Sequence, residues 1–281
     1  MLRTMARILT LMAVHAHPDD ESSSTGGVLA RYAAEGIRTV VVTCTNGELG
    51  DGPRHVKPGQ DGHDESQVAK TRLEELREAC DLLAVSHLEL LGYHDSGMAD
   101  WSDKDRGEAF CNVPVPVAAG RLVELFELYQ PDVVVTYNED GGYNHPDHIQ
   151  AHRITVAAID KSGTPAKLYF TARRRRDFER MRQVMTERGI DVPTPPTPDP
   201  ERLRRMEEAE RQITTTVDTT AVVDAKRAAL AAHASQLDES WFVRFPPDLF
   251  GEIFGSETFI RARDTTGAPV PEDDLFAGLR P

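Results

Sequence analysis

The stretch ILTLMAVHAHPDDE, residues 8–21, joins a short apolar run to a dense group of histidine and carboxylate side chains. The apolar part, from Ile8 to His15, has the length and composition of a buried β-strand. Pro18 keeps the residue before it out of helical geometry, so the chain must turn sharply after this strand. His17 and Asp20 can then curl back towards one point, which makes the end of this strand a candidate site.

The tripeptide His-Pro-Asp occurs a second time, in NHPDH at residues 144–148. Pro146 suits the first turn of a helix. His145 and His148 are three residues apart and would share one helix face, so both could point into one cavity. A lone HPD is a weak signal, because an aspartate such as Asp147 near a helix start often only caps the helix. Two HPD segments at expected strand ends, each with an added ligand-type residue, favour a metal site.

Short β-branched or apolar runs alternate with amphipathic helical segments through the first half of the chain. We expect strands at 8–15, 37–45, 87–92 and 132–137, and helices at 26–35, 64–84 and around 122–129. This alternation predicts an α/β fold, a Rossmann-like and mostly parallel sheet flanked by helices. Residues 1–165 should form this core and carry the metal site.

Residues 166–281 have a different pattern and should form a smaller C-terminal α+β lobe that caps the core and completes the pocket. We expect a basic helix at 173–188, a stiff Pro-rich linker at 191–200, a helix at 201–212, a strand at 213–223 and a helix at 224–236. The Arg173–Arg176 run lies on a helix that also bears acidic residues. A solvated face is therefore the expected role of this run, with a lid over the pocket as the alternative.

Composition narrows the classes of function that this 281-residue chain could have. Its residues are 40% hydrophobic and 28% charged, as in a globular protein. Its formal charge of −14 opposes binding to nucleic acid or to acidic membranes, so a small-molecule substrate is expected. Cys44, Cys80 and Cys111 are sparse and odd in number, which favours a reducing compartment. We expect a cytoplasmic protein, with the short apolar N-terminal run acting as a strand rather than a signal peptide. The sequence says nothing of the oligomeric state.

Polar residues gather where the expected strands end. His17, Asp19 and Asp20 follow the first strand, Glu48 the second, Asp95 the third, and residues 138–148 the fourth. In parallel α/β sheets, ligands bind beyond the carboxyl ends of the strands. Catalytic zinc sites use three protein ligands and keep one position for water, and His17, Asp20 and His148 offer such a His₂Asp set.

A hydrolase also needs a base and a group that stabilises the oxyanion. Asp19 adjoins a candidate ligand and is free to act as the general base on the water. His145 could stabilise the oxyanion or protonate the leaving nitrogen, with Asp147 fixing its tautomer or raising its pKa. Tyr143, on the flexible Gly141-Gly142 turn, could swing in as a further donor.

The motifs AHPDDE and HPDH together resemble those of the PIG-L/LmbE-like family of zinc-dependent N-deacetylases. RYAAEG, VTCTNGELGD, DSGMA, TYNEDGGYNHPDH, LAAHASQLD and PEDDLFAGL look like its actinobacterial branch, so the resemblance covers most of the chain. That branch contains the N-acetylglucosaminyl-inositol deacetylase and the mycothiol S-conjugate amidase.

The resemblance implies a role for each site residue. It implies zinc ligands at His17, Asp20 and His148, a general base at Asp19, an acid or oxyanion stabiliser at His145, a mobile oxyanion donor at Tyr143, and substrate contacts at Arg72, Glu48 and Asp95. Two features leave the substrate open. Ser24 stands where the amidase subtype is expected to carry lysine, whereas PEDDLF looks closer to the amidase.

We therefore expect a zinc-dependent amidohydrolase that removes an N-acyl group, acetyl first of all, from a glycosidic, aminosugar-containing metabolite. Fe²⁺, Co²⁺ or Mn²⁺ would also suit the ligand set. A mycothiol S-conjugate amidase-like enzyme and a tailoring deacylase of secondary metabolism are the alternatives within this class. A non-catalytic metal-dependent sugar-binding protein and a structural zinc site are the alternatives outside it.

Overall fold

One mixed sheet of seven strands organises the computed structural model, which describes residues 7–189, 200–236 and 245–280. Its strands are β1 (Thr10–His15), β2 (Arg38–Thr45), β3 (His87–Tyr93), β4 (Val133–Thr136), β5 (Lys167–Ala172), β6 (Thr215–Asp218) and β7 (Ser256–Asp264). The spatial order is β3-β2-β1-β4-β5-β7-β6. Strands β1 to β5 are parallel, and β7 runs antiparallel to both of its neighbours. This arrangement confirms the α/β, mostly parallel fold.

The opening strand β1 lies between β2 and β4, and all six of its residues are buried. Successive side chains of a strand point to opposite faces of the sheet. Leu11 and Ala13 accordingly belong to one hydrophobic core, and Met12 and Val14 belong to the other. Burial on both faces explains why this segment is a continuous apolar run rather than an alternating one.

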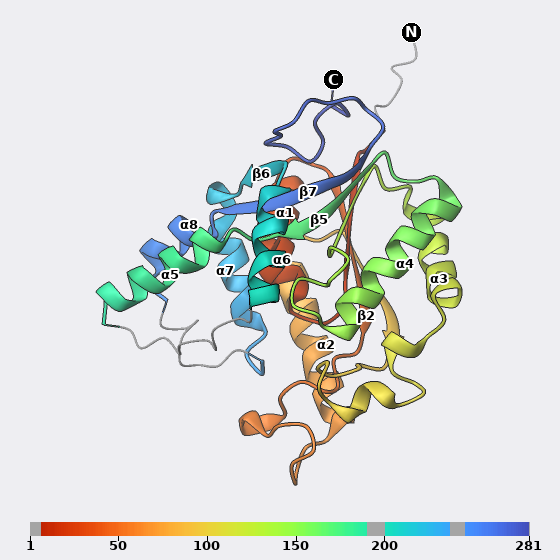
Figure 1. The fold of residues 1–281 in the computed structure, drawn as a ribbon, viewed down its shortest axis with the longest axis vertical. Coiled ribbons are helices and arrows are strands. Elements are labelled where there is room, and N and C mark those ends of the chain that lie inside the picture. Colours follow the sequence, from red (N-terminus) through yellow and green to blue (C-terminus); the bar gives the residue numbers. More distant parts are fainter. Residues whose placement is uncertain (1–6, 190–199, 237–244, 281) are drawn as a thin grey trace.

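Helices cover both faces of the sheet (Figure 1). The core that contains Leu11 includes side chains of α1 (Asp20–Ala34), α2 (Glu65–Leu82) and α7 (Val223–Ala232). The core that contains Met12 includes side chains of α3 (Val115–Tyr129) and α4 (Pro146–Ser162). Helices α5 (Arg175–Glu187), α6 (Pro200–Arg211) and α8 (Pro247–Phe254) lie farther along the chain, and short 3₁₀ turns lie at Pro53–His55, Ser102–Asp105, Phe110–Asn112 and Thr220–Val222. A small third core joins side chains of α5, α7 and α8. No helix in the described ranges is both long and apolar enough to cross a membrane.

The expected start of the first helix is wrong. Helix α1 begins at Asp20 rather than near Gly26, so part of the AHPDDE motif forms its first turn. Gly26 and Gly27 therefore lie inside the helix and do not mark its start. A Cβ on Gly27 would lie 2.6 Å from Thr219 Oγ1, so this glycine permits the close approach of the segment before α7.

The C-terminal elements differ from expectation in one boundary and in three missed elements. The strand expected at 213–223 ends at Asp218, and the sequence reasoning missed β5, β7 and α8. The division of the chain into a core of residues 1–165 and a lobe of residues 166–281 stays a prediction. The seven-stranded sheet contains strands from both segments. The linker expected at 191–200 lies outside the described residues except at its last position.

The arginine run at the start of α5 is largely solvated, as expected. Arg175 and Arg176 have side chains that are 47% and 69% exposed, and Arg175 pairs with Glu179 at 2.8 Å. Arg173 instead reaches α1, where its Nη2 donates to Ser23 O at 3.2 Å.

Candidate active site

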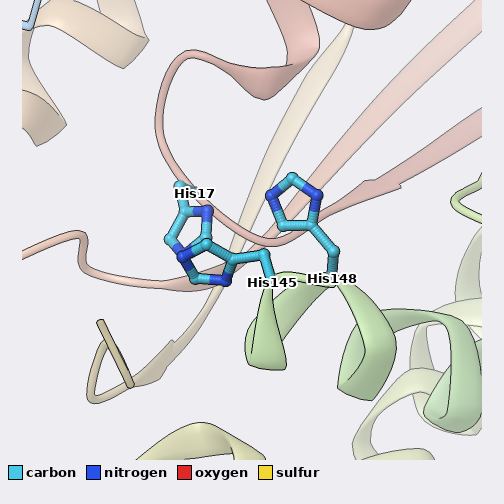
Figure 2. Close-up of side chains that lie close together, drawn as sticks. All are labelled: His17, His145 and His148. Atoms are coloured by element: carbon cyan, nitrogen blue, oxygen red, sulfur yellow. The ribbon is translucent and has the colours of Figure 1, made fainter. Parts of the chain in front are cut away.

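The candidate residues converge at the carboxyl ends of the parallel strands. His17 follows β1 and Asp20 opens α1, Asp95 follows β3, and His145 and His148 lie at the start of α4. Figure 2 shows the three histidine rings pointing at one another from the β1–α1 loop and from α4. All five side chains are buried.

His148 presents a free nitrogen lone pair to this cluster. Its Nδ1 lies 3.1 Å from the carbonyl oxygen of Gly141, which can only accept, so Nδ1 carries the proton. Its Nε2 is buried without a hydrogen-bond partner and lies 3.4 Å from Asp20 Oδ2. A cation bound by both His148 Nε2 and the Asp20 carboxylate would satisfy this buried nitrogen.

His17 brings a second ring nitrogen to the Asp20 carboxylate. Its Nε2 lies 3.2 Å from Asp147 Oδ2 and would donate to that carboxylate, while its Nδ1 lies 3.2 Å from Asp20 Oδ2. Zinc bonds of about 2.0–2.1 Å at tetrahedral angles separate two ligand atoms by about 3.3–3.4 Å. The spacings of Asp20 Oδ2 from His17 and from His148 fit this value, and a carboxylate on the other ring nitrogen is usual for a metal-bound histidine.

The surrounding carboxylates also favour a cation here. Although burial lowers it, the pKa of His17 is raised well above its usual value by Asp95, Asp147 and Asp20. A divalent cation would gain from the same three negative charges that hold a proton on His17.

Two other groups of donors meet at His17. Ligand atoms of His17, His145 and His148 lie within 4.8 Å of one another, and so do those of His17, Asp95 and Asp147. His145 is poorly suited to bind metal, because its Nδ1 accepts a hydrogen bond from the backbone N–H of Asp147 at 3.2 Å. The neutral ring then carries its proton on Nε2, and neither nitrogen offers a free lone pair.

His145 is instead suited to donate a hydrogen bond while uncharged. Burial, reinforced by His17 and His148, lowers its pKa to about 2. Asp147 fixes the tautomer of His145 through its backbone N–H rather than its carboxylate, and the alternative expectation, that Asp147 raises the pKa of His145, is wrong. That carboxylate accepts from His17 and from the backbone N–H and hydroxyl of Ser96, and only the backbone N–H of Asp147 reaches His145.

Asp19 lies beside the cluster with its carboxylate partly open. Its side chain is 36% exposed, and its Oδ2 accepts from Arg72 Nη2 at 3.0 Å. Burial raises its pKa and the Arg72 guanidinium opposes that rise. Its backbone is unusual for a residue other than glycine, with φ 117° and ψ −26°. The Asp19 side chain is more exposed than those of Asp20, Asp95 and Asp147, so it is the best placed of these four to meet a small molecule from solvent.

The three expected substrate contacts lie behind Asp19 and His17. Arg72 also donates to Pro18 O at 2.6 Å and to Gly47 O at 2.7 Å. Glu48 Oε2 accepts from the backbone N–H of Asp95 at 3.1 Å. Arg72, Glu48 and Asp95 are all buried, so they form a charged floor whose described contacts are with the protein itself.

Tyr143 stands at the rim of the site, 45% exposed. The centroid of its ring is 4.9 Å from that of His148 and 5.7 Å from that of His145. It follows Gly141 and Gly142, which have φ angles of 64° and 78°. A hydroxyl on this turn is placed to approach a ligand from the solvent side.

Sequence reasoning missed four residues of the site. Ser96 holds Asp147, and Tyr137 stacks on the His148 ring with centroids 4.0 Å apart. Glu21 accepts from the backbone N–H of Asp19, and His233 lies 2.7 Å from Glu21. Each of the four lies in a motif that carries the family resemblance: Ser96 in DSGMA, Tyr137 in TYNEDGGYNHPDH, Glu21 in AHPDDE and His233 in LAAHASQLD. The resemblance was therefore the signal that could have identified these residues.

The chain resembles known proteins along most of its length. The family model PIG-L, described as GlcNAc-PI de-N-acetylase, matches residues 12–159. The chain is 36% identical over 291 residues to the mycothiol S-conjugate amidase of Streptomyces coelicolor, covering 97% of this chain and 98% of that one. It is 39% identical over 282 residues to the 1D-myo-inositol 2-acetamido-2-deoxy-alpha-D-glucopyranoside deacetylase of Acidothermus cellulolyticus, covering 97% and 96%.

A solved structure shares the fold. The N,N'-diacetylchitobiose deacetylase of Pyrococcus horikoshii superposes with a TM-score of 0.59 at 18% identity, covering 90% of this chain and 83% of that one. The family match and the two close relatives confirm the resemblance drawn from the AHPDDE and HPDH motifs. The chain belongs to the PIG-L family.

Proposed function

We propose that this protein is a zinc-dependent amidohydrolase that removes an N-acyl group, acetyl first of all, from an aminosugar-containing metabolite. One observation carries the proposal. Asp20 Oδ2 lies 3.2 Å from His17 Nδ1 and 3.4 Å from the unpartnered His148 Nε2, next to the partly open carboxylate of Asp19. Relatives named as a deacetylase and an amidase, matched over nearly the whole chain, support the reaction class.

His17 Nδ1, Asp20 Oδ2 and His148 Nε2 would hold the metal. A zinc ion there would acidify a water molecule and polarise the acyl oxygen of the substrate. Fe²⁺, Co²⁺ and Mn²⁺ suit the same donors.

The remaining steps belong to side chains of this protein. Asp19 takes a proton from the attacking water as the new C–O bond forms. His145 donates a hydrogen bond from its Nε2–H to the acyl oxygen as negative charge develops there, and Tyr143 adds a second hydrogen-bond donor from the solvent side. Because His145 stays neutral and holds its proton, Asp19 returns the proton to the nitrogen as the C–N bond breaks. The products are a free amine and a carboxylate.

The substrate proposal rests on the relatives. We propose an N-acetylglucosaminyl-inositol or a closely related glycoside, bound over the charged floor of Arg72, Glu48 and Asp95. A mycothiol conjugate is the first alternative, because the amidase relative is nearly as similar to this chain as the deacetylase relative is. A tailoring deacylase of secondary metabolism is the second.

We place this reaction in the cytoplasm, on the basis of the three sparse cysteines. Cys44 and Cys80 are buried free thiols, as suits a reducing compartment. Nucleic acid is not a proposed partner, given the charge of −14.

A substrate panel tests the proposal. Zinc-loaded protein is incubated with N-acetylglucosaminyl-inositol, a mycothiol conjugate and simple N-acetylhexosamines, and amine release is measured. Release from at least one of them, lost in Asp19→Asn with zinc still bound, is the expected result. A sugar-binding protein without turnover would bind a glycoside and release no amine from any, and that result would overturn the proposal.

A further inference from the structure

The buried carboxylate of Glu21 lies beside Asp19, the proposed base, and its hydrogen bonds go to residues other than the proposed metal ligands. Glu21 is fully buried in the first turn of α1, and its Oε1 lies 2.7 Å from Nε2 of His233. His233 is the C-cap residue, directly after the last residue of α7, and it is 1% exposed. The pair therefore ties the end of α7 to the start of α1.

The other oxygen of Glu21 holds the backbone of the proposed base. Glu21 Oε2 accepts from the backbone N–H of Asp19 at 3.0 Å. Asp19 has φ 117°, a conformation that a residue with a Cβ adopts only when its surroundings impose it. Arg72 holds the preceding carbonyl, Pro18 O, at 2.6 Å. The strained residue is thus held from both sides, by a carboxylate on its N–H and by a guanidinium on the carbonyl before it.

This tie is separate from the proposed ligands. Within the described part of the chain, the Glu21 and His233 side chains form hydrogen bonds with each other, with Ser22 and with the backbone of Asp19. Breaking the tie should therefore move Asp19 while the metal donors stay in place.

We propose that Glu21 and His233 are positioning residues, which hold the Asp19 carboxylate at the attacking water through its backbone. This inference rests on the proposed function, in which Asp19 is the base. It makes α7, from the C-terminal part of the chain, a determinant of the rate of the reaction.

Two isosteric variants of His233 test the inference. His233→Gln places an amide nitrogen near the position of Nε2 and keeps the donor to Glu21, whereas His233→Asn reaches only the position of Nδ1 and loses it. A misplacement of about 1 Å at a catalytic group can cost about a hundredfold in rate. We expect kcat of His233→Asn to fall by about that factor, with KM unchanged and zinc affinity, measured by chelator competition, also unchanged. His233→Gln should keep most of the rate.

Lys226→Met is the matched control. Lys226 lies on the same helix and forms an equally buried ion pair, 2.6 Å from Glu257, which in turn accepts from the backbone N–H groups of Gly27 and Val28 in α1. This variant loosens α7 from α1 without touching Asp19, so its kcat should stay close to that of the parent protein.

The outcomes separate this inference from the proposed function. A loss of kcat in His233→Asn that Gln restores and that disappears in an Asp19→Asn background supports the inference. Full kcat in His233→Asn, or an equal loss in Lys226→Met, would overturn it and leave the base assignment standing. Full activity in Asp19→Asn would instead overturn the proposed base. If His233→Asn does not fold, Glu21→Leu breaks the same tie from its other end and is judged by the same criteria.

Discussion

Gly141→Ala should weaken metal binding through His148, which it touches directly. Gly141 has φ 64°, and a Cβ there would lie 2.6 Å from His148 Cβ and 3.0 Å from the backbone nitrogen of Ile149. Neither neighbour is a flexible side-chain end, so the turn or the helix start must shift. The carbonyl of Gly141 also holds His148 Nδ1 at 3.1 Å, and this shift would break that hydrogen bond.

The size of the effect follows from what is lost. The left-handed backbone costs a residue with a Cβ about 1–2 kcal/mol. Loss of the partner that orients a metal-bound histidine typically reduces metal affinity by about 10–100-fold. We expect Gly141→Ala to show both effects.

Gly142→Ala separates the two effects. Gly142 has φ 78°, and a Cβ there would have nothing within 4 Å, so this variant carries the backbone cost alone. Zinc affinity is measured for both variants by chelator competition, and stability by thermal unfolding of the metal-free proteins. Equal zinc affinities for Gly141→Ala, Gly142→Ala and the parent protein would refute the proposed orientation of His148.

Four further outcomes are expected. Asp19→Asn should lower kcat by about a hundredfold or more with zinc retained, as judged by amine release and metal analysis. His145→Ala should lower kcat by about 10²–10³-fold and still bind zinc, whereas His17→Ala should lose zinc, and the reverse pattern would exchange their roles. Removal of zinc by a chelator should abolish activity while circular dichroism stays native and added zinc restores the rate; unfolding would indicate a structural metal. Glu272→Leu should lower the free energy of unfolding by about 3–5 kcal/mol in a denaturant titration, because it leaves the buried Lys167 without its carboxylate; an unchanged midpoint would contradict this.

Three of the parallel strands, β1, β2 and β4, could be predicted because nearly all of their residues are buried. The runs at 8–15, 37–45 and 132–137 consist mostly of apolar or β-branched residues, as burial on both faces favours, and the structure confirms a strand in each. The strands β5 and β7 were missed because each is buried over only part of its length. In β7, Arg261 and Arg263 are partly buried on either side of the exposed Ala262, and these charged residues hide the strand from a hydrophobicity count.

The candidate site could be located by a rule of topology. Parallel strands end at one edge of the sheet, so the residues after β1, β3 and β4 had to meet. The rule says nothing about which atoms face each other. The carboxylate of Asp147 accepts from His17, and only its backbone N–H reaches His145.

The contribution of α7 to the site could not be foreseen. His233 is more than 200 positions from Glu21 along the chain, and no local pattern links the two residues. Their contact depends on how α7 packs against α1, which is a property of the whole fold.

The most direct test of the proposed centre is a crystal structure of the zinc-loaded protein, with the metal located by its anomalous scattering. The ion is expected to be bound by His17 Nδ1, Asp20 Oδ2 and His148 Nε2, with His145 and Asp19 outside its ligand shell. Zinc bound by His145, or between His17, Asp95 and Asp147, would contradict the account.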